Sequence, residues 1–207
     1  MNKSVNTRFI IAIPCFLAIF TMFTIFSAVF YLRQHEASDE TPNSKDILLQ
    51  VGINILGYFF GDDIVHESEP VVTLHDSVNR LFRLVLSHYT ENKFEIVLNS
   101  GDAEIIKIVP EVEGFYVNEE LAIRITSPFL RDKNEERKNS VLSTVFGEKI
   151  FEDMIYEVYR EDTSFLVRLV HANPYYRIKS NFLGFPTANV NKTNGRIINF
   201  EIRIRWF

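Results

Sequence analysis

The sequence of 207 residues contains only one cysteine, Cys15. A disulfide within the chain is therefore excluded, and so is a metal site with several thiolate ligands. Extracellular eukaryotic domains of this size more often carry pairs of cysteines. The scarcity of cysteine favours a bacterial periplasm, with the mitochondrial intermembrane space as the alternative.

Charged residues are absent from residues 9–32, FIIAIPCFLAIFTMFTIFSAVFYL. A helix of this length measures about 36 Å and can cross a hydrocarbon core of about 30 Å with some tilt. The run is longer than the about 7 to 15 apolar residues of a signal peptide, and it ends without a small-residue cleavage site. It predicts an uncleaved transmembrane anchor in the lipid bilayer. Its small residues Thr21, Thr24 and Ala28 could contact a neighbouring membrane helix, although a purely lipid-facing helix is the alternative.

Acidic residues are also absent before the apolar run, whereas Lys3 and Arg8 precede it. The positive-inside rule therefore places residues 1–8 in the cytoplasm and exports the rest of the chain. Residues 33–45 are polar and predict a flexible tether. We expect a single-pass protein of the inner (cytoplasmic) membrane, with residues 46–207 as one domain in the periplasm. The mitochondrial inner membrane, with the domain facing the intermembrane space, is the alternative.

Positive charge is scarce beyond residue 33. That part of the chain holds all 27 acidic residues but only 19 of the 22 basic ones, which gives a formal charge of about −8. Nucleic acids and anionic lipid surfaces need a positively charged partner surface. The composition argues against both and leaves membrane or periplasmic proteins as the expected partners.

Catalytic signatures are missing. The chain contains no H-E-x-x-H, G-x-S-x-G, P-loop or dinucleotide fingerprint. Residues 61–69 bring four carboxylates and one histidine together, which could hold a divalent cation. Their spacing matches no known cation loop, so we interpret the cluster as an acidic surface turn. We therefore expect no enzyme, no metal and no cofactor, with a metal-dependent hydrolase as the minor alternative.

Apolar periodicity predicts helices at residues 46–60, 74–89 and 134–153. The helix at 74–89 has the clearest pattern, because its apolar residues share one helical face behind a T-x-x-D capping sequence. Strands are predicted at 94–98, 104–109, 121–126, 155–160, 165–171 and 198–206. The last strand alternates strictly between apolar and polar residues, with Ile198 in its inward set, and Asn194-Gly195 before it predicts a hairpin turn. The polar residues 188–193 are expected to project into solvent.

This order of elements predicts an α+β domain: one antiparallel sheet with two to three helices on one face. A helix followed by strands occurs twice, near 74–126 and 139–206, without matching residues. The layout resembles that of the cystatin-like periplasmic domains of secretion-system scaffolds, in architecture alone.

Aromatic residues are abundant in the C-terminal third. They form the core if they are buried, and they anchor a protein interface or line an apolar pocket if they are partly exposed. The candidate interface residues are Tyr175, Tyr176, Phe182, Phe185, Trp206 and Phe207.

Our first hypothesis for the function is a non-catalytic accessory or scaffold subunit of a bacterial envelope complex, in secretion, assembly or membrane signalling. The alternative is a periplasmic sensing domain that binds an apolar small molecule or lipid and signals through a partner membrane protein. Both hypotheses use the expected anchor, and the aromatic surplus favours the second as well as the first.

Overall fold

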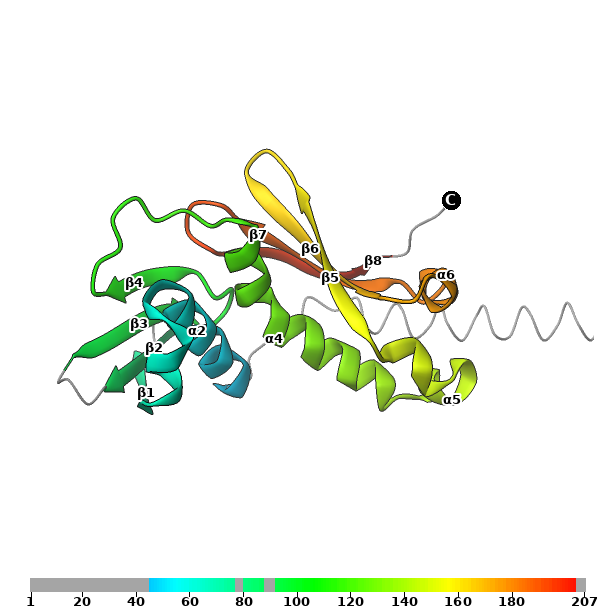
Figure 1. Ribbon diagram of the computed structural model, residues 1–207, viewed down its shortest axis with the longest axis horizontal. Coiled ribbons are helices and arrows are strands. Elements are labelled where there is room, and N and C mark those ends of the chain that lie inside the picture. The colour runs from blue at the N-terminus through cyan, green and yellow to red at the C-terminus, as the bar shows by residue number, and fades with distance from the viewer. Residues whose placement is uncertain (1–44, 77–79, 88–91, 204–207) are drawn as a thin grey trace, which may run out of the picture. The chain divides into compact units, whose positions relative to one another are not determined.

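The computed structural model describes residues 45–76, 80–87 and 92–203 (Figure 1). All of them belong to one compact unit, residues 39–207. In these described ranges, no helix has both the length and the apolar character that a membrane crossing requires. The predicted anchor at 9–32 and most of the predicted tether lie outside them.

The same order of elements occurs twice: a long helix, a short helical segment and four antiparallel strands. The first half comprises α2 Lys45–Phe60, α3 Asp62–His66, β1 Glu69–Asp76, β2 Leu81–Ser87, β3 Lys93–Asn99 and β4 Ile105–Val109. The second half comprises α4 Glu119–Lys138, α5 Val141–Phe146, the 3-10 helix η1 Glu148–Phe151, β5 Met154–Arg160, β6 Ser164–His171, α6 Pro174–Asn181, β7 Phe185–Asn191 and β8 Ile197–Arg203. Each sheet pairs its strands in sequence order, so both are meanders (Figure 1).

One apolar core runs through both halves. Helix α2 packs on β2 and β3, helix α4 packs on β5, β6 and β7, and the two helices pack against each other. Gly52 allows the close approach of α2, because a Cβ atom there would lie 2.8 Å from Leu84 Cδ2. Fully buried members of this core come from both halves: Val51, Ile55, Leu84, Ile96, Leu121, Ile125, Val167 and Ala188.

Helix α4 continues through a proline. Asn118 caps its N-terminus by accepting a hydrogen bond from the Leu121 N–H at 2.8 Å. Pro128 lies inside the helix and has no N–H to donate to Arg124 O, four residues earlier. Asn54 of α2 supplies the missing donor, since its Nδ2 lies 2.9 Å from Arg124 O. The contact between the two long helices therefore completes the backbone of α4.

The turn between β7 and β8 connects the two halves. Asn194 O accepts a hydrogen bond from Ile105 N at 2.9 Å, and Asn194 Nδ2 donates to Glu104 Oε1 at 2.7 Å. Gly195 follows with a φ of 70°, and a Cβ atom there would lie 2.9 Å from Ile105 Cδ1 and 3.1 Å from Ile125 Cδ1. This position needs glycine both for its backbone angle and for space.

The α+β class and six of the expected elements are confirmed, among them the last strand, which β8 Ile197–Arg203 matches over its described residues. Helix α2 matches the predicted helix at 46–60, and β3 and β4 match the strands at 94–98 and 104–109. Strands β5 and β6 match the predicted hairpin at 155–160 and 165–171, and the Asn194-Gly195 turn is present. The structure has two antiparallel sheets where the sequence predicted one, and the repeated order lies at 45–109 and 119–203.

The predicted helix at 74–89 is wrong, because the chain forms β1 and β2 there. Phe82, Leu84 and Leu86 are buried and alternate with less buried residues, as expected for a strand with one core-facing side. The apolar face of the predicted helix includes Phe82 but neither Leu84 nor Leu86. Arg80, with a φ of 52°, lies in the turn just before β2.

The predicted strand at 121–126 and helix at 134–153 are also wrong as drawn. Residues 119–138 form the single helix α4, which includes Pro128. Two short helical segments, α5 and η1, follow it, because Ser140 caps a new helix and Gly147 has a φ of 87°.

Two predictions about side-chain direction near β8 are wrong as well. Residues 188–193 do not project into solvent, since Ala188 and Val190 are fully buried. Ile198 is exposed although the alternation places it inward. The pairing of β7 with β8 shifts between Asn189 and Val190, and such a bulge changes which residues face the core.

Candidate functional site

Two short helices of the second half carry a group of exposed apolar side chains. We define the α5–α6 surface as Val141 and Val145 of α5 with Tyr175, Ile178 and Phe182 of α6 and its C-cap; these side chains are 55% to 72% exposed. Both helices pack against η1, at the same end of the second sheet (Figure 1). Large apolar side chains gathered in this way commonly mark a binding surface.

Local sequence explains the exposed face of α6. Asn173 caps the helix by accepting a hydrogen bond from Tyr175 N at 2.9 Å, and Pro174 occupies the first turn. Residues three and seven positions after Tyr175 lie on the same helical face, which aligns Ile178 and Phe182 with it. Ser180 and Asn181 are buried on the other side.

A buried histidine fixes the start of α6. His171 Nδ1 accepts a hydrogen bond from Asn173 N at 2.8 Å, and His171 Nε2 lies 3.0 Å from Lys149 O of η1. Because Nδ1 is an acceptor, the neutral imidazole carries its proton on Nε2 and donates it to that carbonyl. Tyr176 stacks on the imidazole with ring centroids 4.9 Å apart. The ring thus links β6, η1 and α6.

Helix α4 holds the other end of this region. Arg137 is 3% exposed, and its Nη2 donates to Leu183 O and Gly184 O, both at 3.1 Å. Asn134 donates from Nδ2 to Phe151 O of η1 at 2.8 Å. These bonds attach the segments around the α5–α6 surface to a long core helix, so the backbone that carries the exposed side chains is held in place.

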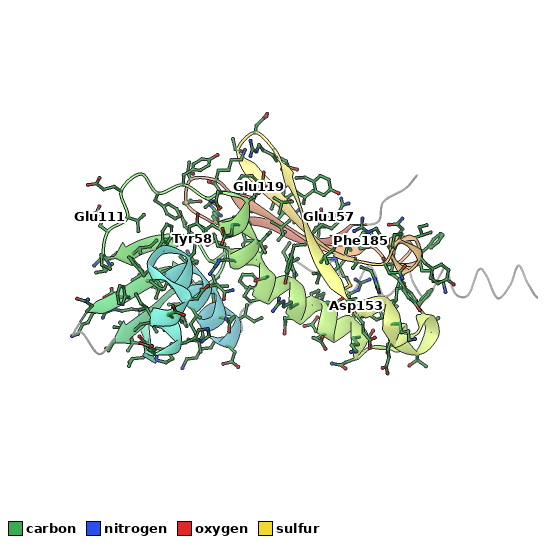
Figure 2. The ribbon with its side chains drawn as sticks, viewed as in Figure 1. Tyr58, Glu111, Glu119, Asp153, Glu157 and Phe185 are labelled. Atoms are coloured by element: carbon green, nitrogen blue, oxygen red, sulfur yellow. The ribbon has the colours of Figure 1, made fainter. Side chains whose placement is uncertain are left out.

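A cavity of about 270 Å³ lies between α6 and the face of the second sheet that points away from α4. Its apolar lining includes Tyr159, Val170, Ile178 and Phe185. Figure 2 shows Glu157 and Phe185, two of its lining residues, on the second sheet beside α6. We call this space the α6 cavity. One helix therefore both carries the exposed surface and forms a wall of a cavity that is open to solvent, since the lining residues Tyr159 and Ile178 are 40% and 59% exposed.

Charged groups in the α6 cavity are unequally paired. Glu157 and Arg177 form an ion pair at 2.7 Å, and Arg177 Nε also donates to His171 O at 3.1 Å. Arg168 lies with its guanidinium 4.9 Å from the Tyr159 ring centroid. Within the described residues, Arg168 Nε is buried without a hydrogen-bond partner. No described carboxylate forms an ion pair with Arg168, whose cross-strand neighbour Glu157 is paired with Arg177.

The predicted interface residues have different environments. Tyr175 and Phe182 are exposed on the α5–α6 surface, Tyr176 is partly buried against His171, and Phe185 is buried in the second sheet. Trp206 and Phe207 lie outside the described residues, as do Thr21, Thr24 and Ala28 of the predicted anchor.

The acidic residues 61–69 make structural contacts. Asp62 Oδ1 accepts a hydrogen bond from Arg124 Nη1 at 2.8 Å, and this contact ties α3 to α4. That hydrogen bond and the nearby positive charge hold the pKa of Asp62 below its ordinary value of 3.8. Among the residues that the structure describes, no cluster of histidine, cysteine, aspartate and glutamate is arranged to hold a metal ion.

Sequence reasoning missed Ile178, Arg168 and Arg137. The spacing of Tyr175, Ile178 and Phe182 could have indicated a shared helical face, had the helix been recognised. Arg168 was visible as a lone charge inside the apolar stretch FLVRLVH of β6. No local pattern separates the buried Arg137 from its exposed neighbours in a charged run, because its burial depends on the distant turn at Leu183.

A role for this chain is inferred from its own geometry. No protein-family model matches the sequence, and neither a curated protein nor a solved structure does.

Proposed function

We propose that the chain is a non-catalytic, membrane-anchored accessory or scaffold subunit of a bacterial envelope complex that acts by binding other proteins. The observation that carries this proposal is the α5–α6 surface, with five large apolar side chains more than half exposed on a base of buried polar contacts. Aromatic and aliphatic anchors of this kind contribute most of the binding energy in protein interfaces.

The proposed setting follows from the sequence. Residues 9–32 anchor the chain in the inner membrane with residues 1–8 in the cytoplasm, and residues 33–45 tether the domain 46–207 in the periplasm. A mitochondrial inner membrane with the domain in the intermembrane space is the alternative. The envelope complex that the chain belongs to functions in secretion, assembly or membrane signalling.

Photo-crosslinking tests this role in intact cells. The full-length chain carries a photoreactive phenylalanine analogue in place of Phe182 or, in a second variant, of Ile178. We expect discrete crosslinked species from both positions, because both side chains stand on the proposed contact face. Ile106 of β4, half exposed in the first half, is the matched control and should give none. Uncrosslinked monomer from both α6 positions would count against the proposal.

The α6 cavity favours a second candidate function, a periplasmic sensing domain for a small molecule or lipid that signals through a partner membrane protein. A mostly apolar cavity with a few polar groups is the usual form of a ligand site. Native mass spectrometry of the chain isolated from its own membrane tests this function, with a retained small molecule as the expected result. Repeated absence of any bound mass would remove this candidate.

A further inference from the structure

The polar groups of the α6 cavity define a chemical class of ligand. The cavity is somewhat smaller than the about 300 Å³ at which pockets for drug-sized molecules begin, so its ligand is small. Tyr159, Val170, Ile178 and Phe185 supply apolar walls that suit an aromatic ring or a branched aliphatic chain. The remaining question is which polar head such a ligand carries.

Arg168 favours an anionic head. Its side chain is half-buried, and its Nε–H, which is buried without an acceptor among the described residues, loses hydration without compensation. Its contacts with the Tyr159 and Phe185 rings, at 4.9 and 6.0 Å from their centroids, orient the group but provide no hydrogen-bond acceptor. A carboxylate would accept from Nε–H and neutralise the charge.

A second polar group meets the same cavity. Asn181 is 8% exposed and lines the α6 cavity, and no described residue hydrogen-bonds to its side-chain amide. Its NH₂ group can donate to a second carboxylate oxygen. A bound carboxylate would give an acceptor to the buried Arg168 Nε–H and to the Asn181 amide that lines the same cavity.

The charge balance selects a monoanion. Arg177 is already neutralised by Glu157, so Arg168 supplies one net positive charge. A phosphate or phosphonate dianion would leave one negative charge in excess, close to the Glu157 carboxylate that also lines the cavity. The cavity therefore discriminates by charge as well as by size.

We propose that the α6 cavity binds a small monocarboxylate with an aromatic or branched aliphatic body. Arg168 and Asn181 hold the carboxylate, and the body packs between Ile178 of α6 and Phe185 of β7. This proposal rests on the second candidate function, a ligand-binding domain, and its site shares Ile178 with the α5–α6 surface.

Isothermal titration calorimetry of the full-length chain in detergent micelles, with benzoate as the probe, tests the proposal. Benzoate should bind. Benzamide, which has the same shape but no charge, should bind about tenfold to a hundredfold more weakly, as expected for the loss of a hydrogen bond to a charged group. Phenylphosphonate should also bind more weakly than benzoate. Arg168→Gln should weaken benzoate binding by a similar factor, while Arg160→Gln on β5, a matched surface change, should leave it unchanged.

Several outcomes would overturn the proposal: no benzoate binding, equal binding by benzamide, tighter binding of phenylphosphonate, or full affinity in Arg168→Gln. Equal binding by benzamide would leave an apolar ligand site and so the second candidate function intact. If Arg168→Gln does not fold, ¹⁵N-arginine NMR of the unaltered chain decides. The Arg168 Nε–Hε signal should then move saturably with benzoate, and an unmoved signal would refute the site.

Discussion

Asn54 and Pro128 form a coupled pair at the residue scale. Asn54 Nδ2 donates to Arg124 O, the carbonyl from which Pro128 withholds a helical hydrogen bond. Asn54→Ala should lower the free energy of unfolding by about 1–3 kcal/mol, because a partly buried carbonyl loses its closer donor and keeps only the Ser127 hydroxyl at 3.4 Å. Pro128→Ala restores an N–H that can reach Arg124 O.

A double-mutant cycle in urea denaturation measures that coupling. In the Pro128→Ala background, Asn54→Ala should cost at most about half as much as in the natural chain, since the carbonyl has another donor. Identical costs in the two backgrounds would show that the amide contributes by packing alone.

The ion pair between Asp62 and Arg124 makes stability depend on pH. Because Arg124 lowers the pKa of Asp62 in the folded state, the carboxylate stabilises the fold above its unfolded pKa of about 3.9. That contribution disappears as the pH falls through the folded pKa. Asp62→Asn should therefore reduce the free energy of unfolding at pH 7 by less than about 1 kcal/mol, since the pair is largely exposed.

Denaturation from pH 7 down to pH 2 checks the direction. The difference between the natural chain and Asp62→Asn should shrink below about pH 4. Asp63→Asn, next to it on α3 and without an ion pair among the described residues, serves as control and should show no such difference. If the difference in the free energy of unfolding between the natural chain and Asp62→Asn grew in acid, the sign that we assign would be wrong.

At the scale of elements, the β7–β8 turn is the connection most sensitive to substitution. Gly195→Ala forces a positive φ on alanine and places its Cβ against Ile105 and Ile125. We expect the free energy of unfolding to fall by about 2–4 kcal/mol, from strain plus overpacking. Gly114→Ala is the control, with a φ of 64° and nothing within 4 Å of its Cβ, and should cost only about 1 kcal/mol. Comparable losses in both variants would mean that the crowding at Gly195 relaxes freely.

Elements with local signals could be predicted from the sequence. The helix at 46–60 and the hairpins around residues 99–102 and 161–164 have apolar periods and turn residues that agree with their structure. The hairpin at β1–β2 could not be recognised, because its apolar residues also fit a helical face and its turn lacks glycine. Helix α4 was missed because proline locally predicts a helix end, whereas Asn54, 74 residues earlier, donates to the carbonyl that Pro128 leaves without its helical donor.

The candidate site could be predicted only in part. Tyr175 and Phe182 were identified from aromatic content, and both are exposed. Phe185 has the same chemistry but lies on a strand, and its burial follows from sheet pairing with distant residues. The role of Arg168 as a cavity-lining residue can be inferred only once α6 is known to cover the sheet beside it. Such tertiary facts have no local sequence pattern.

At the scale of the whole molecule, the shared core predicts cooperative unfolding of the two halves. Ile55→Ala, a fully buried change in the first half, should lower the global free energy of unfolding by about 2–5 kcal/mol. Native-state hydrogen exchange should show equal losses of protection in β2 of the first half and β6 of the second. Loss in β2 with β6 unaffected would show that the halves unfold separately.

Besides the extra helical segment after α4, the two halves differ at the connection between their second and third strands. Strands β2 and β3 are joined by residues 88–92, whereas residues 172–184 between β6 and β7 contain α6. Helix α6, which carries the exposed face and forms a cavity wall, is thus an insertion. The corresponding connection of the first half is only a few residues long. Substitutions in an inserted helix need not disturb the strands on either side of it. Changes of binding specificity in this chain should therefore accumulate in α6 while the two sheets stay the same.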